Sequence, residues 1–171
     1  EAAGYDRMGV SSPPEIRPFE SDEDVRWAAS VMAGSEPWIT LGRGYEASRA
    51  LLSDGSKERS LARVAGDRAG FLILNMAGAF AGYVQTVCVA PEFRGRGVGT
   101  SLMDFAEKRV FRDSPNIFLC VSSFNERARR LYARLGYAPV GELEDYLVSG
   151  HSELLMRKTI GPLDGFVRRG R

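Results

Sequence analysis

Histidine and cysteine are scarce in this chain of 171 residues, which contains one histidine, His151, and two cysteines, Cys88 and Cys120. No Cys-x-x-Cys pair and no group of histidines occurs, so we expect no metal site. Both cysteines lie in apolar, strand-like segments, where a thiol is usually a small buried core residue. The absence of a disulfide framework favours a cytoplasmic location, and a catalytic Cys–His pair is disfavoured.

A strong charge bias and a long apolar run are also missing. The formal net charge is +1 at pH 7, so the composition gives no reason to expect nucleic acid as a partner. No apolar run approaches the roughly 20 residues that cross a membrane, and residues 1–12 do not resemble a secretory signal. We therefore expect no membrane association. A hydrophobic content of 44% is sufficient for one domain with a substantial core.

Helical and strand-like patterns alternate along the chain and predict one mixed α/β domain over residues 14–160, with tails at 1–13 and 161–171. Ser21 and Asn125 each precede an apolar pattern with helical spacing and are typical N-cap residues. Two further helices are expected at 45–52 and 98–110, and strands at 15–19, 60–65, 69–74, 81–89, 117–121, 137–143 and 152–159.

A turn rich in glycine and arginine follows the strand expected at 81–89. Residues 87–99 read Val-Cys-Val-Ala-Pro-Glu-Phe-Arg-Gly-Arg-Gly-Val-Gly, and a helical pattern starts directly after them. Unpaired N–H groups at a helix N-terminus bind anions, while glycine lets the backbone approach a ligand closely and adopt a positive φ. We therefore predict a site for a phosphate-bearing ligand, formed by Gly95, Gly97 and Gly99 together with the charges of Arg94 and Arg96.

The spacing within this turn distinguishes among phosphate-binding motifs. A P-loop requires a lysine that is absent here, and a dinucleotide fingerprint requires two residues between its last glycines, where this chain has only Val98. The observed pattern, Arg-x-x-Gly-x-Gly at 94–99, resembles the acyl-CoA signature of the GNAT superfamily of N-acetyltransferases. In that family the loop binds the pyrophosphate of coenzyme A, which implies contacts from residues 94–100, Val98 and Thr100 included. The alternative is a turn that only joins a strand to a helix.

The segment from Asn125 to Tyr137 carries a second resemblance to the same family. Asn125 is followed by Ala128, then Tyr132, and the segment ends in Gly-Tyr. The resemblance implies that Tyr132 is the general acid for the leaving thiolate and that Asn125 belongs to the cofactor site. The alternative for Tyr132 is an ordinary core aromatic on an amphipathic helix.

The fold implied by this resemblance is a single α+β domain, a mixed, mostly antiparallel sheet of about seven strands with helices on both faces. Its fourth and fifth strands, here 81–89 and 117–121, splay apart and admit the pantetheine arm of acetyl-CoA. Backbone groups near Val87 and Val89 are implied to pair with the pantetheine amides. An N–H of Val87 or Cys88 is implied to stabilise the oxyanion.

The general base is not assigned by these motifs. Within the superfamily the chain is most similar to ribosomal-protein alanine N-acetyltransferases, which have a glutamate in the fifth strand as base. Cys120 occupies that position here, and a neutral thiol in an apolar strand is a poor base. The polar residues considered instead, none of them preferred, are Glu92, Glu142, Glu144, Asp145 and His151.

The resemblance implies an N-acetyltransferase that moves an acetyl group from acetyl-CoA to a primary amine directly, within a ternary complex. The acceptor is an amine of a small molecule, peptide or protein, and the sequence leaves its identity and a homodimeric state open. A non-catalytic acyl-CoA-binding sensor or interaction domain is the alternative, although such a domain has no need for a proton donor at Tyr132.

Overall fold

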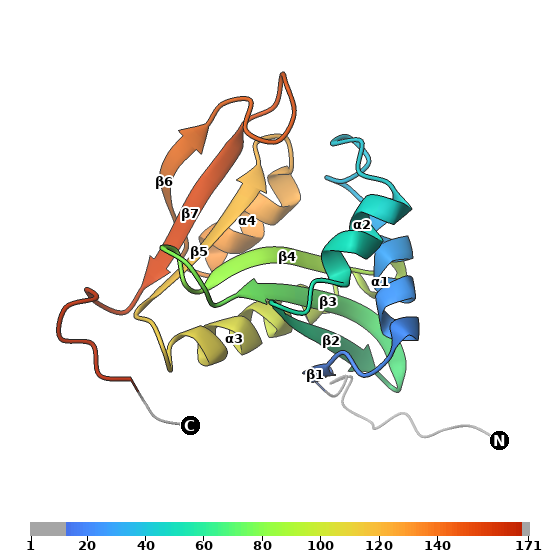
Figure 1. Ribbon diagram of the computed structural model, residues 1–171, viewed down its shortest axis with the longest axis horizontal. Coiled ribbons are helices and arrows are strands. Elements are labelled where there is room, and N and C mark those ends of the chain that lie inside the picture. The colour runs from blue at the N-terminus through green and yellow to red at the C-terminus, as the bar shows by residue number, and fades with distance from the viewer. Residues whose placement is uncertain (1–12, 169–171) are drawn as a thin grey trace.

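The computed structural model describes residues 13–168, which form one seven-stranded sheet with helices on both faces (Figure 1). The strand order is β1-β2-β3-β4-β5-β7-β6, and every neighbouring pair is antiparallel except β4–β5. Of the expected tails at 1–13 and 161–171, residues 1–12 and 169–171 lie outside the described residues, and the predicted domain limits stay a prediction. The strands are β1 (Glu15–Pro18), β2 (Glu58–Val64), β3 (Asp67–Asn75), β4 (Tyr83–Val89), β5 (Asn116–Ser122), β6 (Ala138–Leu143) and β7 (Glu153–Thr159), and the helices are α1 (Asp22–Ala33), α2 (Tyr45–Leu52), η1 (Pro91–Phe93, a 3-10 turn), α3 (Val98–Val110) and α4 (Glu126–Arg134).

The helix starts follow the capping residues expected from the sequence. Ser21 caps α1, because its hydroxyl accepts a hydrogen bond from the Asp24 N–H at 3.3 Å. Asn125 caps α4, because its Oδ1 accepts from the Ala128 N–H at 3.2 Å. The predicted α+β fold and its order of elements are confirmed.

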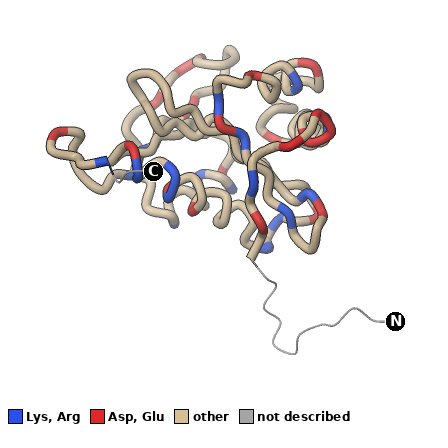
Figure 2. Tube along the Cα trace, turned by 60° about the horizontal axis from the view of Figure 1, so that its bottom comes forward, with Lys and Arg blue, Asp and Glu red and all other residues tan. Residues whose placement is uncertain are grey.

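Two hydrophobic clusters lie on opposite faces of the sheet, because successive side chains of a strand alternate between faces. On β3, Phe71 and Ile73 pack with α1 and α2, whereas Leu72 and Leu74 pack with α3, β5 and Tyr132 of α4. The sheet is therefore fixed by helices on both sides. Basic and acidic residues are interspersed along the described chain (Figure 2). No described helix has the length and hydrophobicity needed to cross a membrane.

Strands β4 and β5 pair only where they begin. The structure pairs Tyr83 with Phe118 and Val84 with Leu119, and no further pairs follow between these strands in the described sheet. Next to this point β4 contains one residue more than β3, since Val84 and Thr86 face adjacent β3 residues and Gln85 faces none. Such a bulge bends a strand, and the two strands diverge beyond it, as the sequence resemblance implied (Figure 1).

Candidate active site

The glycine–arginine turn leads directly into the N-terminus of α3. Gly97 is the N-cap with φ +81°, Gly95 has φ +76°, and no side chain caps the helix. The first helical hydrogen bond runs from the Ser101 N–H to the Gly97 carbonyl, so the preceding N–H groups are available to an anion. Gly99 is the second residue of α3, so the positive φ that glycine allows is used at Gly95 and Gly97.

The two arginines of this turn have different surroundings. Arg94 Nε donates to the Val89 carbonyl at 3.0 Å, and its Nη2 donates to the Ser35 hydroxyl at 3.0 Å. Arg94 therefore ties the end of β4 to the end of α1. Arg96 is exposed, and its guanidinium lies 5.6 Å from the centre of the Phe93 ring. Arg96 is thus the more available cation for a bound phosphate.

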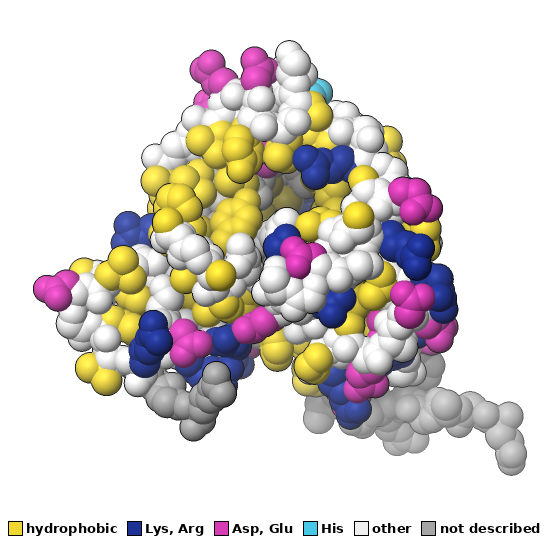
Figure 3. Space-filling model, viewed as in Figure 1, with side chains coloured by type: hydrophobic (Ala, Val, Ile, Leu, Met, Phe, Trp, Pro, Cys, Tyr) yellow, Lys and Arg dark blue, Asp and Glu magenta, His cyan; other side chains and the backbone are white. Residues whose placement is uncertain are grey.

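A cavity of about 250 Å³ lies between the diverging strands. Its walls come from β4, β5 and α4, from the α1–α2 connection and from the β6–β7 loop, and this region of the surface is hollowed among hydrophobic side chains (Figure 3). Three of the predicted site residues line it: Val87, Asn125 and Tyr132. The other predicted residues lie elsewhere: Cys88 is buried under α1, Val89 is the last residue of β4, residues 94–97 form the turn, and residues 98–100 begin α3.

Tyr132 lies on α4 with 8% of its surface exposed. Its ring packs edge-on against Tyr137, with 6.0 Å between ring centres. Burial, with a smaller contribution from Cys88, raises the pKa of Tyr132 to about 12. The phenol is therefore protonated at neutral pH, which is the form that a general acid requires.

Comparisons with known proteins agree with this arrangement. The family model described as "Acetyltransferase (GNAT) family" matches residues 22–137, which is more than half of the chain. The chain belongs to the GNAT family of acetyltransferases. The family resemblance expected from residues 87–101 and 125–137 is thus confirmed.

This chain spans different shares of the lengths of its relatives. An uncharacterized Mycobacterium leprae protein is 37% identical over 147 residues, which is 84% of this chain but 39% of that protein. The N-alpha-acetyltransferase RimI of Mycobacterium tuberculosis is 29% identical over 141 residues, covering 78% of this chain and 82% of RimI. An aminoglycoside 6'-N-acetyltransferase solved with coenzyme A has the same fold, with a TM-score of 0.69 at 18% identity over 86% of this chain and 98% of that one.

None of the residues considered as a base lines the cavity of this GNAT domain. Asp145 accepts a hydrogen bond from the Gly150 N–H at 2.6 Å, and His151 packs edge-on against Phe124 with 4.9 Å between ring centres. The other three are exposed on η1, β6 and the loop after β6, namely Glu92, Glu142 and Glu144. Cys120 does line the cavity, and burial raises the pKa of its thiol, so it is neutral there.

The cavity contains a carboxylate that the sequence reasoning missed. Glu153, the first residue of β7, is 4% exposed, lines the cavity and accepts a hydrogen bond from the Ser122 hydroxyl at 2.5 Å. Burial raises the pKa of the Glu153 carboxyl, against smaller opposing effects of Ser122 and the charge of Arg43. A charged residue at the start of the apolar Glu-Leu-Leu-Met run was the available signal.

Proposed function

We propose that this chain transfers the acetyl group of acetyl-CoA directly to a primary amine. The main supporting observation is the divergence of β4 and β5, since it opens a cavity lined by Val87 of β4 and by Tyr132 of α4. The glycine turn at the end of β4 supplies N–H groups and Arg96 for the pyrophosphate. The thioester would then lie along β4, between the turn and the acceptor.

The proposed reaction follows from these positions. An N–H of β4 at Val87 or Cys88 stabilises the oxyanion that forms when the amine attacks the thioester carbonyl. Tyr132 protonates the departing thiolate of coenzyme A. Because the Val89 carbonyl already accepts from Arg94, Val87 is the better partner for a pantetheine amide. The free thiols of Cys88 and Cys120 are compatible with a reducing cytoplasm, where we place this activity.

The test compares the purified chain with its Tyr132→Phe variant. Calorimetry measures acetyl-CoA binding, and thiol release measures turnover with an alanine-initiated peptide, spermidine and an aminoglycoside as acceptors. We expect the variant to bind acetyl-CoA with a Kd within twofold of the wild-type value and to lose 10²–10⁴-fold in kcat, the usual contribution of a general acid. Tight binding without turnover on any amine would instead favour the sensor, and an unchanged kcat would remove Tyr132 from the mechanism.

A further inference from the structure

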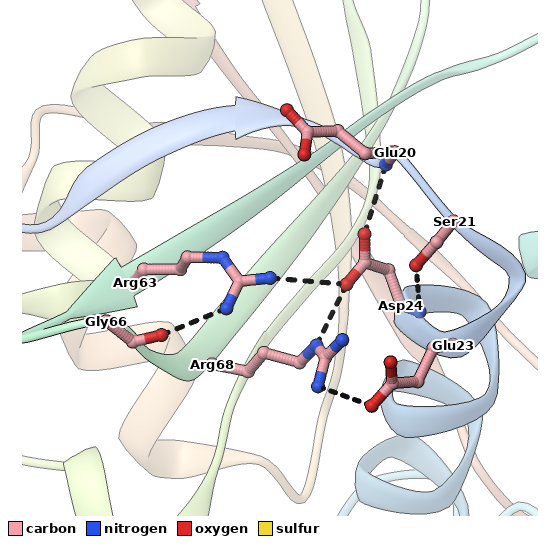
Figure 4. Close-up of polar contacts among 7 residues, drawn as sticks. All are labelled: Glu20, Ser21, Glu23, Asp24, Arg63, Gly66 and Arg68. Carbon is pink, nitrogen blue, oxygen red and sulfur yellow. Dashed lines mark hydrogen bonds and ion pairs between the residues drawn. The ribbon is translucent and has the colours of Figure 1, made fainter.

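Two buried carboxylates in this domain differ in how completely their charge is compensated. Asp24 at the start of α1 is 2% exposed and accepts hydrogen bonds from the Glu20 N–H at 3.0 Å and from Arg68 Nε at 2.8 Å, with Arg63 Nη2 at 3.5 Å (Figure 4). Burial alone would raise the pKa of Asp24, but these donors outweigh it and lower the pKa. Asp24 is thus a satisfied structural anion that joins α1 to the β2–β3 hairpin.

Glu153 is buried to a similar degree but forms no ion pair within the described chain, and Arg43 acts on it only as a nearby charge. Its recorded hydrogen bond comes from the neutral hydroxyl of Ser122, and no Lys or Arg of residues 13–168 forms an ion pair with it. A buried carboxylate without an ion-pair partner is costly, and such cost is typical of groups retained for function. Glu153 also borders the cavity, whereas Asp24 does not.

The sheet register places Glu153 beside the position expected for a base. Glu153 lies directly opposite Ser122 on β5, so their side chains share one face of the sheet. Cys120 is two residues from Ser122 along β5 and shares that face, because strand side chains alternate. All three residues line the same cavity, so the carboxylate from β7 lies beside the β5 position where the family resemblance implied a base.

We propose that Glu153 binds the ammonium group of the acceptor and accepts its proton, an inference that rests on the proposed acetyl transfer to an amine. The other polar or titratable groups around the cavity are Glu36 and Arg43 from the α1–α2 connection, Tyr83, Gln85 and Thr86 from β4, Asn125 and Tyr132 at α4, and Tyr146 from the β6–β7 loop. Trp38, Tyr83 and Tyr146 add aromatic rings, which attract cations. The acceptor class is therefore a primary ammonium next to an apolar or aromatic group.

The proposed reaction removes two protons from the acceptor nitrogen and breaks the thioester C–S bond. The ammonium group gives one proton to the Glu153 carboxylate, and the neutral amine uses its freed electron pair to form the C–N bond with the acetyl carbonyl carbon. The C–S bond then breaks, and the thiolate takes the proton of Tyr132. The nitrogen releases its second proton to the Tyr132 phenolate. The products are an N-acetyl amide, the free thiol of coenzyme A, neutral Tyr132 and protonated Glu153, which returns its proton to solvent.

A binding experiment tests this without requiring turnover. The side-chain carboxyl carbons of glutamate are labelled with ¹³C, and the Glu153 signal is assigned from its absence in Glu153→Gln. We expect n-butylammonium to lower the pKa read from this signal, because a cation favours the ionised carboxylate, and n-butanol to have no effect. Glu153→Gln should bind n-butylammonium at least tenfold more weakly. The proposal is overturned if n-butylammonium leaves the pKa of Glu153 unchanged, or if Glu153→Gln binds n-butylammonium as tightly as the wild type does.

Kinetics separates a base from a merely structural carboxylate. Glu153→Gln keeps an acceptor for the Ser122 hydrogen bond, and Glu142→Gln on exposed β6 is the matched control. With any amine that the wild type acetylates, we expect Glu153→Gln to lose 10²–10⁴-fold in kcat/KM together with the acidic limb of the pH profile, while its Kd for acetyl-CoA stays within twofold.

The control variant and the n-butylammonium titration distinguish a failure of the proposed base from a failure of the proposed function. Glu142→Gln should match the wild type, and retention of the acidic limb in Glu153→Gln would assign that limb to another group and overturn the proposal. If the wild type binds no acetyl-CoA or acetylates no amine, the proposed function fails, and the n-butylammonium titration still decides the role of Glu153.

Discussion

Replacing Gly97 by alanine should weaken acetyl-CoA binding through the backbone of the turn. Gly97 has φ +81°, and a Cβ added there would meet no protein atom within 4 Å. The methyl group would therefore project away from the protein, on the side of the α3 N-terminus where we place the pyrophosphate. The substitution should mainly weaken the affinity for acetyl-CoA. Its cost in folding stability should be limited, and the control variant Gly66→Ala measures that cost separately.

The expected magnitudes follow from this geometry. An alanine in the left-handed region costs about 1–2 kcal/mol of stability. Loss of one hydrogen bond between a backbone N–H and a charged phosphate costs about 1.5–3 kcal/mol. That free energy corresponds to roughly a 10- to 150-fold increase in the Kd for acetyl-CoA, since each 1.4 kcal/mol changes the Kd about tenfold.

Gly66 in the β2–β3 turn is the matched control. It has φ +89°, and an added Cβ there also meets no atom within 4 Å, so Gly66→Ala carries the same backbone strain away from the cavity. Urea unfolding should give similar stability losses for both variants, whereas calorimetry should show a weaker Kd only for Gly97→Ala. An unchanged Kd in Gly97→Ala, alongside equal losses of stability, would refute the assignment of this turn to the pyrophosphate.

Two further predictions concern stability. Asp24→Asn should cost about 3 kcal/mol, since it leaves Arg68 without its buried partner. Because the pKa of Asp24 is lowered in the folded protein, this stabilisation is present above the ordinary value of 3.8 and is lost as pH falls through the folded pKa. Urea unfolding at neutral and acid pH should show the gap from wild type shrinking in acid, and a constant gap would contradict the charge-based role. Gly82→Ala should lose about 2–4 kcal/mol, because its Cβ would lie 2.6 Å from Val110 Cγ1 at a φ of +88°. Unfolding midpoints close to wild type would show that the β4–β5 junction can relax.

Local chemistry made most of the fold predictable from the sequence. The capping oxygens of Ser21 and Asn125 act within three residues along the chain, so their roles can be inferred without tertiary information. The divergence of β4 and β5 depends on a bulge and on sheet order, and it was expected only through the family resemblance.

The candidate base could not be predicted because its environment is made by distant pairing. Glu153 and Ser122 are 31 residues apart, and only the β5–β7 register makes them neighbours on one face. Sequence reasoning therefore searched for polar residues near the motifs and in the loop after β6. The same reasoning could assign Tyr132 to a helix, but it had no means of showing that its ring borders the space between β4 and β5.

The replacement at Cys120 has a physical consequence for Glu153. A glutamate at position 120 would lie on the same face as Glu153, and two neighbouring carboxylates in a buried cavity cannot both ionise without a large cost. A neutral thiol at Cys120 removes that repulsion and leaves one carboxylate that can alternate between charged and protonated forms. A single carboxylate on this face is what the proposed proton transfer from an ammonium group to Glu153 needs.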